Sequence, residues 1–360
     1  MLSLQARATP SRLMSYLSPL LAVLLTTICG AILFAALGKD PLAGLAVFFW
    51  EPIKNLRGWT EIALKCTPLI LCAIGYAVCY RSAIMSIGAE GMLLAGAIAG
   101  GGVALALDNG TVGGALGTGA GVLSITLVIV AGMLGGMFWA GITALLKDRF
   151  NTNEILVSLM LVYIAGLLLS YLVTGPWRDP KGFNFPQSRM FSSDFLLPIM
   201  VPGTRLNLGF LFALLATGAA WIFLSKSFSG FRLQVGGLAP LAARYAGFSQ
   251  RKTLWTALLI SGAAAGLAGV IETIGPVGQL TPSMSPGYGF AAIIVAYVGR
   301  LHPVGILFSS FIMALFYIGG ELAQSRLGLP NAITGVFQGM LLFFLLAADV
   351  LIAYRIRWGK

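Results

Sequence analysis

The chain has 360 residues, of which 58% are hydrophobic and only 10% are charged, and its formal net charge is +11 at pH 7. Its mean hydropathy is +0.90. Because about a quarter of the residues of a soluble domain are charged, this composition excludes an ordinary soluble protein and, through long continuous apolar runs, predicts an all-α, polytopic inner-membrane helical bundle in place of a β-barrel.

Ten membrane spans are predicted in chain order. They cover residues 16–38, 60–80, 87–107, 118–146, 154–174, 207–225, 253–274, 287–299, 303–323 and 331–354. The run 287–299 is shorter than the roughly 17 residues needed to cross a bilayer. We therefore expect that it either begins earlier, near Pro286, or is a broken helix buried among the others. Arg7 and Arg12 precede the first span, and this span lacks a clear small-x-small cleavage site. The pattern predicts a retained signal anchor.

The basic residues predict the orientation of these spans. With ten spans both termini lie on one side, and that side collects 14 of the 23 Lys and Arg residues, against 9 on the other. Since positive charge favours the cytoplasm, both termini and the segment 230–252 are expected there, whereas 175–206 forms a long outer loop. The basic residues thus report membrane orientation, and nothing indicates a nucleic-acid partner.

Five spans precede the outer loop and five follow it, so the two halves have opposite orientations. This arrangement allows a 5+5 inverted repeat, which is typical of transporters. Internal sequence similarity is weak: IGAEGMLLAG, beginning at 87, and GYGFAAIIVA, beginning at 287, share only a pattern of Gly and other small residues. Small residues at four-residue spacing favour close helix packing. They are Gly96 and Gly100, Gly113, Gly117 and Gly121, Gly132 and Gly136, and Gly262 and Gly266.

Little in the sequence favours enzyme chemistry. The single histidine, His302, has no neighbouring thiol or carboxylate, and the four cysteines lie in apolar runs without metal-ligand spacing. A GxxxxGK[ST] phosphate loop is absent. Acidic residues inside a membrane are costly and therefore mark functional candidates. Of these, Glu90 is the strongest, ahead of Glu272 and Asp349.

The segment 230–252 carries a short basic helix. Gly236 and Gly237 are expected to break the preceding helix, Pro240 suits a first helical turn, and Gly247 suits a C-terminal cap. This pattern predicts a two-turn helix whose exposed small face would fit a groove, with Arg244 and Tyr245 as anchors. An amphipathic loop lying on the membrane surface is the alternative. The small face comprises Ala239, Ala242, Ala243 and Ala246.

Several motifs resemble one family. LAARYAG at 241–247 is similar to the EAA-xxx-G signature of importer permeases of the ATP-binding-cassette (ABC) class, in the NPEAARYAG form seen in permeases for ribose-type sugars and nucleosides. IGAEGMLLAGA at 87–97, TNEILVSLMLVYIA at 152–165 and GYGFAAIIVAYVGRLHPVGIL at 287–307 resemble this family's NIGAEGQLLMGA, VNEVISTIMLNYIA and GYGFTGIAVALLGRNNPLGVL. The resemblance covers most of the chain beyond residue 60. Leu241, Met92, Ser86 and Val162 replace an acid, Gln, Asn and Asn of the family pattern, which leaves the substrate preference open.

The resemblance implies one permease domain over 1–360, with a coupling helix that docks on an ATPase. The implied ATPase-coupling residues are Gly237, Pro240, Ala242, Ala243, Arg244, Tyr245 and Gly247. The implied residues of the translocation route are Ser86, Glu90, Met92, Asn153, Tyr288 and Phe290. It also implies that ATP and Mg are bound by the partner ATPase, with no cofactor, metal or catalytic residue on this chain.

The same resemblance implies several partners besides membrane lipid. They are a cytoplasmic ABC ATPase, a periplasmic or lipid-anchored solute-binding protein of the basic membrane lipoprotein type, and a second, different permease, because the length and the outer loop fit the larger member of a heterodimeric pair. The expected function is ATP-driven import of nucleosides, related small polar solutes or simple sugars in a bacterial inner membrane. An ion-coupled carrier, which would need a mid-membrane acid such as Glu90, and a membrane-embedded enzyme remain alternatives.

Overall fold

The computed structural model describes residues 2–6, 12–108 and 120–358. The chain divides into two compact units: unit 1 comprises Met1–Ile62 and Phe311–Lys360, and unit 2 comprises Ala63–Ser310. Two long helices cross this boundary, α4 (Leu56–Arg81) and α13 (Pro303–Leu327). The expectation of a single permease domain over the whole chain stays a prediction.

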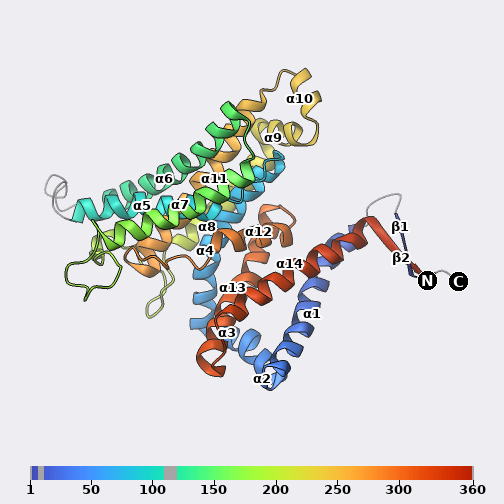
Figure 1. The fold of residues 1–360 in the computed structure, drawn as a ribbon, viewed down its shortest axis with the longest axis horizontal. Coiled ribbons are helices and arrows are strands. Elements are labelled where there is room, and N and C mark those ends of the chain that lie inside the picture. Colours follow the sequence, from blue (N-terminus) through green and yellow to red (C-terminus); the bar gives the residue numbers. More distant parts are fainter. Residues whose placement is uncertain (1, 7–11, 109–119, 359–360) are drawn as a thin grey trace. The chain divides into compact units, whose positions relative to one another are not determined.

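Unit 1 pairs its first and last helices. Its elements are α1 (Arg12–Ala36), α2 (Pro41–Leu45), a π-helical turn (Ala46–Trp50), α3 (Glu51–Lys54) and α14 (Ala332–Ala353). α1 lies along α14 (Figure 1). Phe48 stacks on Phe337 with 4.2 Å between the ring centroids, which joins the π-helical turn to α14. Aromatic burial of this kind supplies a hydrophobic core.

Two short strands in unit 1 were not predicted. β1 (Leu2–Ala6) pairs in antiparallel register with β2 (Tyr354–Trp358). Apart from this pair, the described chain consists of helices, turns and loops, and the prediction of a helical membrane bundle is confirmed.

Unit 2 holds most of the helices. They are α5 (Ala89–Asp108), α6 (Ala120–Phe150), α7 (Glu154–Thr174), α8 (Gly209–Lys226), α9 (Phe228–Leu238), α10 (Pro240–Tyr245), α11 (Gln250–Glu272) and α12 (Tyr288–Val298). A 3-10 turn (Ser193–Phe195) interrupts the loop after α7, and a π-helical turn (Thr273–Val277) extends α11. α5, α6 and α11 pack extensively on one another, and α7 lies along α5 (Figure 1).

Nine described helices are long and apolar enough to cross a membrane, and α12 is a shorter apolar helix. Together they match the ten predicted spans in order. α12 has 11 residues and begins at Tyr288, after a non-helical approach through Pro286. Of the two expectations for this span, the short broken helix is therefore correct. α6, α7 and α8 expose many large apolar side chains, whereas α4, α5 and α12 are mostly buried.

Glycine allows the closest helix approach in unit 2. A Cβ atom added to Gly136 of α6 would lie 2.2 Å from the Gly262 carbonyl oxygen of α11, and one added to Gly96 of α5 would lie 2.4 Å from the Gly266 Cα atom. Any side chain here would push the helices apart, so these glycines act in packing, as their spacing predicted. Gly113 and Gly117 lie outside the described residues.

Candidate functional site

The segment after α8 folds as two successive helices. α9 ends at Leu238, and α10 begins with Pro240 in its first turn, as the sequence predicted. Gly247 adopts a left-handed conformation with φ +80°, and the Phe248 N–H donates to the Ala243 carbonyl oxygen at 2.9 Å. This geometry is the predicted glycine C-cap.

Two details of this segment differ from expectation. Gly236 and Gly237 do not break α9 but form its last turn, and the break falls at Ala239. Ala243 is only 1% exposed and is not part of the exposed small face, whereas Ala242 and Arg244 are exposed. Tyr245 is 97% exposed, so α10 presents an anchor-like aromatic side chain to its surroundings.

Gly237 joins this segment to the end of α4. A Cβ atom there would lie 2.3 Å from the Arg81 carbonyl oxygen and 3.0 Å from the Ala83 nitrogen. The contact is therefore between two backbones, and only glycine fits. A tertiary contact of this kind overrides the low helix propensity of glycine, which explains why α9 continues through it.

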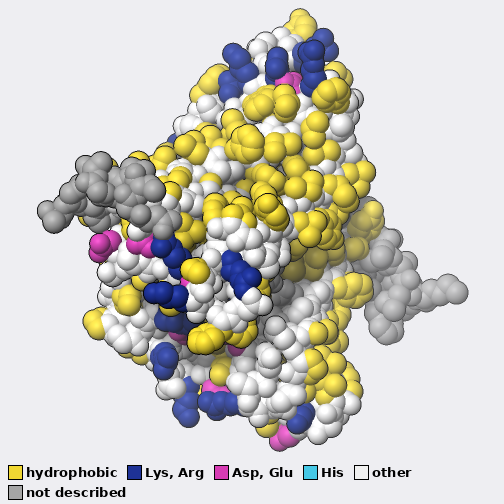
Figure 2. Space-filling model, turned by 60° about the vertical axis from the view of Figure 1, so that its left-hand side comes forward, with side chains coloured by type: hydrophobic (Ala, Val, Ile, Leu, Met, Phe, Trp, Pro, Cys, Tyr) yellow, Lys and Arg dark blue, Asp and Glu magenta, His cyan; other side chains and the backbone are white. Residues whose placement is uncertain are grey.

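Figure 2 shows Lys and Arg side chains gathered at the end of the molecule that carries α9 and α10. Arg251, next to the first residue of α11, forms an ion pair of 2.7 Å with Asp148 in the last turn of α6. The Trp255 indole N–H donates to the same carboxylate at 3.1 Å. These bonds fix the start of α11, and hence the end of the loop that carries α10.

The helices α5 and α12 meet at their N-terminal ends. The Glu90 carboxylate, which is 6% exposed, accepts a hydrogen bond of 2.6 Å from the backbone N–H of Gly289. A Cβ atom on Gly289 would lie 2.2 Å from the Glu90 nitrogen, so the two turns touch through their backbones. The Ser285 hydroxyl also donates to this carboxylate. Glu90 thus provides an N-terminal cap for α12 from another helix.

The approach to α5 is held in the same way. The Ile87 N–H donates to the Ser158 hydroxyl of α7 at 3.1 Å. Through the hydrogen bond between Glu90 and Gly289, the two sequence segments with weak internal similarity, around 87 and 287, are direct neighbours in space.

The other predicted route residues fall into two groups. Ser86, Met92 and Tyr288 are buried at 3%, 1% and 0% exposure, so their side chains pack within the chain in this conformation. Phe290 is 40% exposed, and Asn153 is exposed but accepts a hydrogen bond of 2.9 Å from the Ile155 N–H as the N-cap of α7. The structure brings Glu90 and the start of α12 together and places Asn153 on another helix end.

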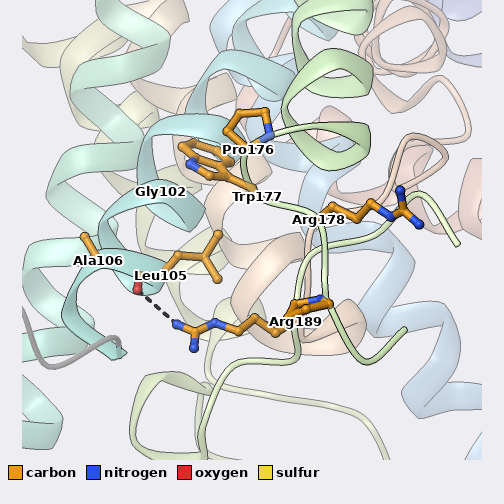
Figure 3. A pocket seen from close by; sticks show the side chains of 8 residues that line it. Gly102, Leu105, Ala106, Pro176, Trp177, Arg178 and Arg189 are labelled. Atoms are coloured by element: carbon orange, nitrogen blue, oxygen red, sulfur yellow. Dashed lines mark hydrogen bonds between the residues drawn. The ribbon is translucent and has the colours of Figure 1, made fainter. Parts of the chain in front are cut away.

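The sequence did not single out Lys65, Trp177, Arg178 or Arg189. The Lys65 ammonium lies 5.6 Å from the ring centroid of Tyr288, an interaction between α4 and α12 that no local motif predicts. The other three line an open cleft of about 440 Å³ between α5 and the loop after α7 (Figure 3). The charges of the two arginines were visible in the loop 175–206, but the sequence did not show that the three residues converge on one cleft.

The two arginines of this cleft differ in role. Arg189 reaches toward α5, donates to the Leu105 carbonyl oxygen at 3.3 Å and lies 3.7 Å from the Asp108 carboxylate (Figure 3). Arg178 is exposed and extends away from α5, and no ion pair joins it to the residues that the structure describes (Figure 3). Of these two arginines, Arg178 is therefore the one whose charge is not paired within the described residues.

The loop that carries this cleft is ordered by hydrogen bonds to the segment after α11. The Ser188 N–H donates to the Leu280 carbonyl oxygen and the Leu280 N–H donates to the Ser188 hydroxyl, both at 2.9 Å. Farther along, the Leu197 N–H donates to the Ile274 carbonyl oxygen at 2.9 Å. The loop is thus fixed to the stretch that leads into α12.

Comparison with known proteins agrees with this architecture. Residues 59–346 match the family described as "Branched-chain amino acid transport system / permease component". The glucose ABC transporter permease protein TsgB13 of Haloferax volcanii is 33% identical, with 99% of this chain and 93% of that protein covered. The guanosine ABC transporter permease protein NupP of Bacillus subtilis is 30% identical, with 97% of each covered. The nucleoside ABC transporter permease protein NupB of Lactococcus lactis is 28% identical, with 91% and 90% covered. This chain therefore belongs to that permease family and is a membrane-spanning permease of an ABC transporter.

Proposed function

We propose that this chain imports nucleosides or related small polar solutes, simple sugars among them, driven by a separate ABC ATPase. The observation that carries the proposal is α10, an exposed helix at a basic end of unit 2 whose Tyr245 side chain is 97% exposed. The named solutes of the relatives, glucose, guanosine and nucleosides, support the solute class. The family membership favours this class over an ion-coupled carrier.

In this proposal α10 is the coupling helix. Arg244 and Tyr245 insert into a groove of the ATPase, and arginine and tyrosine are the residue types that dominate such interfaces. ATP and Mg are bound by the ATPase, and this chain performs no catalytic step. The end that carries α10, together with both termini, then faces the cytoplasm of a bacterial inner membrane.

The contact of Gly237 with the end of α4 gives the coupling helix a physical link to the route. Arg81 and Ala83 lead directly into the segment 84–89, and this segment is followed by Glu90, the cap of α12. A displacement of α10 by the ATPase would therefore reach the start of α12 through contiguous backbone. Phe290, exposed in the first turn of α12, is the best candidate to contact solute.

On the opposite face, the loop 175–206 receives the solute-binding protein. Arg178 offers a charge that steers and orients an acidic partner surface. The exposed apolar faces of α6, α7 and α8 contact lipid and a second, different permease. These assignments complete an importer with one ATPase assembly, two permeases and one binding protein.

Reversal of a charge on α10 tests the proposal. Arg244→Glu should reduce co-purification of the ATPase or uncouple ATP hydrolysis from uptake, because a carboxylate would meet the ATPase groove where a guanidinium belongs. Lys226→Glu, an exposed site at the end of α8, is the matched control and should leave both properties unchanged. Full uptake by Arg244→Glu, with the ATPase bound normally, would remove the coupling-helix assignment.

The energy source is tested separately. Nucleoside uptake in membrane vesicles should stop when the partner ATPase carries an inactivating substitution, since this chain has no phosphate loop of its own. Uptake driven by an ion gradient alone would instead favour the carrier.

A further inference from the structure

A cavity of about 440 Å³ lies beside the coupling segment, within unit 2. It opens where the end of α4 and its following turn meet the last turn of α9 and the turn between α12 and α13. Gly237, whose backbone touches the end of α4, is part of the lining.

The lining is basic. Two arginines, Arg81 and Arg300, belong to it, and no acidic residue does. Arg81 lies against the opposite turn, where its Nη2 atom donates to the Leu301 carbonyl oxygen at 3.4 Å. The two arginines therefore come from turns that are in direct contact. A guanidinium presents its donors in a planar fork that matches phosphate and carboxylate oxygens.

The remaining lining residues are neutral donors and apolar groups. Gln234 adds an amide, which can donate to an anionic oxygen, and Tyr80 adds an aromatic ring. Met85 and Leu238 supply apolar surface and are 44% and 78% exposed. A ligand that satisfies all of these groups carries an anion on one side and an apolar body on the other.

The backbone around the cavity is unusual. Ala83, Arg300 and Leu301 have φ values of +56°, +56° and +54°, and they are half of the six non-glycine residues with positive φ in the described part of the chain. Such conformations persist where surrounding structure enforces them, and they cluster at functional sites. All three line this one cavity.

We propose that the cavity binds a phosphate ester carried on an apolar body, with Arg81 and Arg300 on the phosphate and Met85 and Leu238 against the body. A phosphate is favoured over a carboxylate because two guanidiniums can share its several oxygens. This chemistry is present in an anionic phospholipid of the cytoplasmic leaflet and in soluble organic phosphates of the cytosol. The experiment below distinguishes the two sources.

Occupancy would affect coupling, an inference that rests on the proposed function of α10. The ligand would lie between the last turn of α9 and the turn after α4, the two segments that Gly237 brings together. A bound molecule there would resist any displacement of α9 along α4. A bound ligand would then slow transport. Binding of the ligand itself does not require that α10 is a coupling helix.

The test uses the assembled transporter, purified and reconstituted. The soluble arm titrates phenyl phosphate, which carries a phosphate on an apolar ring and is no substrate for an ATPase, and measures binding by calorimetry. The lipid arm uses nanodiscs that contain phosphatidylglycerol and measures the lipid that native mass spectrometry finds retained after transfer to detergent. Saturable binding of phenyl phosphate indicates a soluble ligand, and retention of phosphatidylglycerol alone indicates a lipid.

Three variants decide the assignment. Arg81→Gln combined with Arg300→Asn should weaken binding at least tenfold, and asparagine tolerates the left-handed backbone at 300. Leu238→Glu places a carboxylate at an exposed lining position, where it repels an anionic ligand, and should abolish binding. This variant keeps the proposal testable if the double variant fails to fold. Lys226→Gln, an exposed basic residue outside the lining, should bind as the unmodified protein does.

The proposal is overturned if neither probe binds saturably, or if the Leu238→Glu variant binds as well as the unmodified protein. Co-purification of the ATPase and basal ATP hydrolysis are measured in the same preparations. If the unmodified protein assembles with the ATPase but binds neither probe, the cavity proposal alone is refuted. Failure of the unmodified chain to assemble with an ATPase refutes the proposed function instead.

Discussion

Glu90 offers the most direct test of how the broken helix α12 is held. Its carboxylate accepts the Gly289 N–H at 2.6 Å and the Ser285 hydroxyl, and it is 6% exposed. A hydrogen bond to a charged group contributes about 1.5–3 kcal/mol, and a neutral one about 1 kcal/mol. Glu90→Gln keeps an acceptor oxygen in place, so it should cost about 1 kcal/mol and leave the transporter assembled and partly active.

Glu90→Leu removes the acceptor altogether. The buried Gly289 N–H is then unsatisfied, at a cost of about 1–3 kcal/mol, with a further loss at Ser285. We expect a lower melting temperature in detergent and impaired uptake. Lys147→Gln is the control, because Lys147 forms a part-exposed ion pair of 2.9 Å with Glu154 and such pairs contribute at most about 1 kcal/mol.

Thermal unfolding of the purified complex and uptake in vesicles are measured for all three variants. If Glu90 has a structural role, stability and uptake fall together, by a small amount in Glu90→Gln and by a larger amount in Glu90→Leu. A Glu90→Gln protein that is stable and fully assembled but has lost transport, or that prefers a different solute, would refute this reasoning and place the carboxylate on the substrate.

Three further predictions concern the two ends of unit 2. Gly237→Ala should uncouple ATP hydrolysis from uptake, since its Cβ would lie 2.3 Å from the Arg81 carbonyl oxygen. Gly236→Ala, whose Cβ would lie 3.3 Å from the nearest side-chain atom, should be tolerated, and equal uptake by the two variants would contradict this. Arg178→Glu should weaken binding of the solute-binding protein in a pull-down without changing basal ATPase activity, and unchanged binding would remove the docking role. Ser188→Ala leaves the Leu280 N–H without its acceptor and should cost about 1–3 kcal/mol in thermal unfolding, which a neutral result would exclude.

Hydropathy was sufficient for the order of the helices, because a span in lipid must be long and apolar whatever its neighbours are. The same argument separated the short helix α12 from the rest. The local rules for Pro240 and Gly247 also held, because a proline in the first turn and a left-handed glycine at the C-terminus satisfy the helix ends without outside help.

Features that depend on distant contacts were not predictable in this way. Gly236 and Gly237 looked like a helix break, yet the contact with the end of α4 holds them in α9. Ala243 looked exposed and is buried. Ala83 and Arg300 have positive φ values but are not glycine or asparagine, so their residue types did not predict a left-handed backbone.

The two glycine contacts of unit 2 have a common physical consequence. Gly237 rests on the backbone after α4, and Gly289 rests on the backbone of Glu90, so both junctions lack a side chain that could change rotamer and absorb a displacement. The stretch between them, residues 84–89, is anchored at Ile87 to Ser158 of α7. In the proposed coupling, a movement at α10 that follows this backbone reaches α12 if the stretch moves as a body against α7. The Ser158 hydroxyl, which no motif singled out, would resist such a movement through its hydrogen bond with the Ile87 N–H.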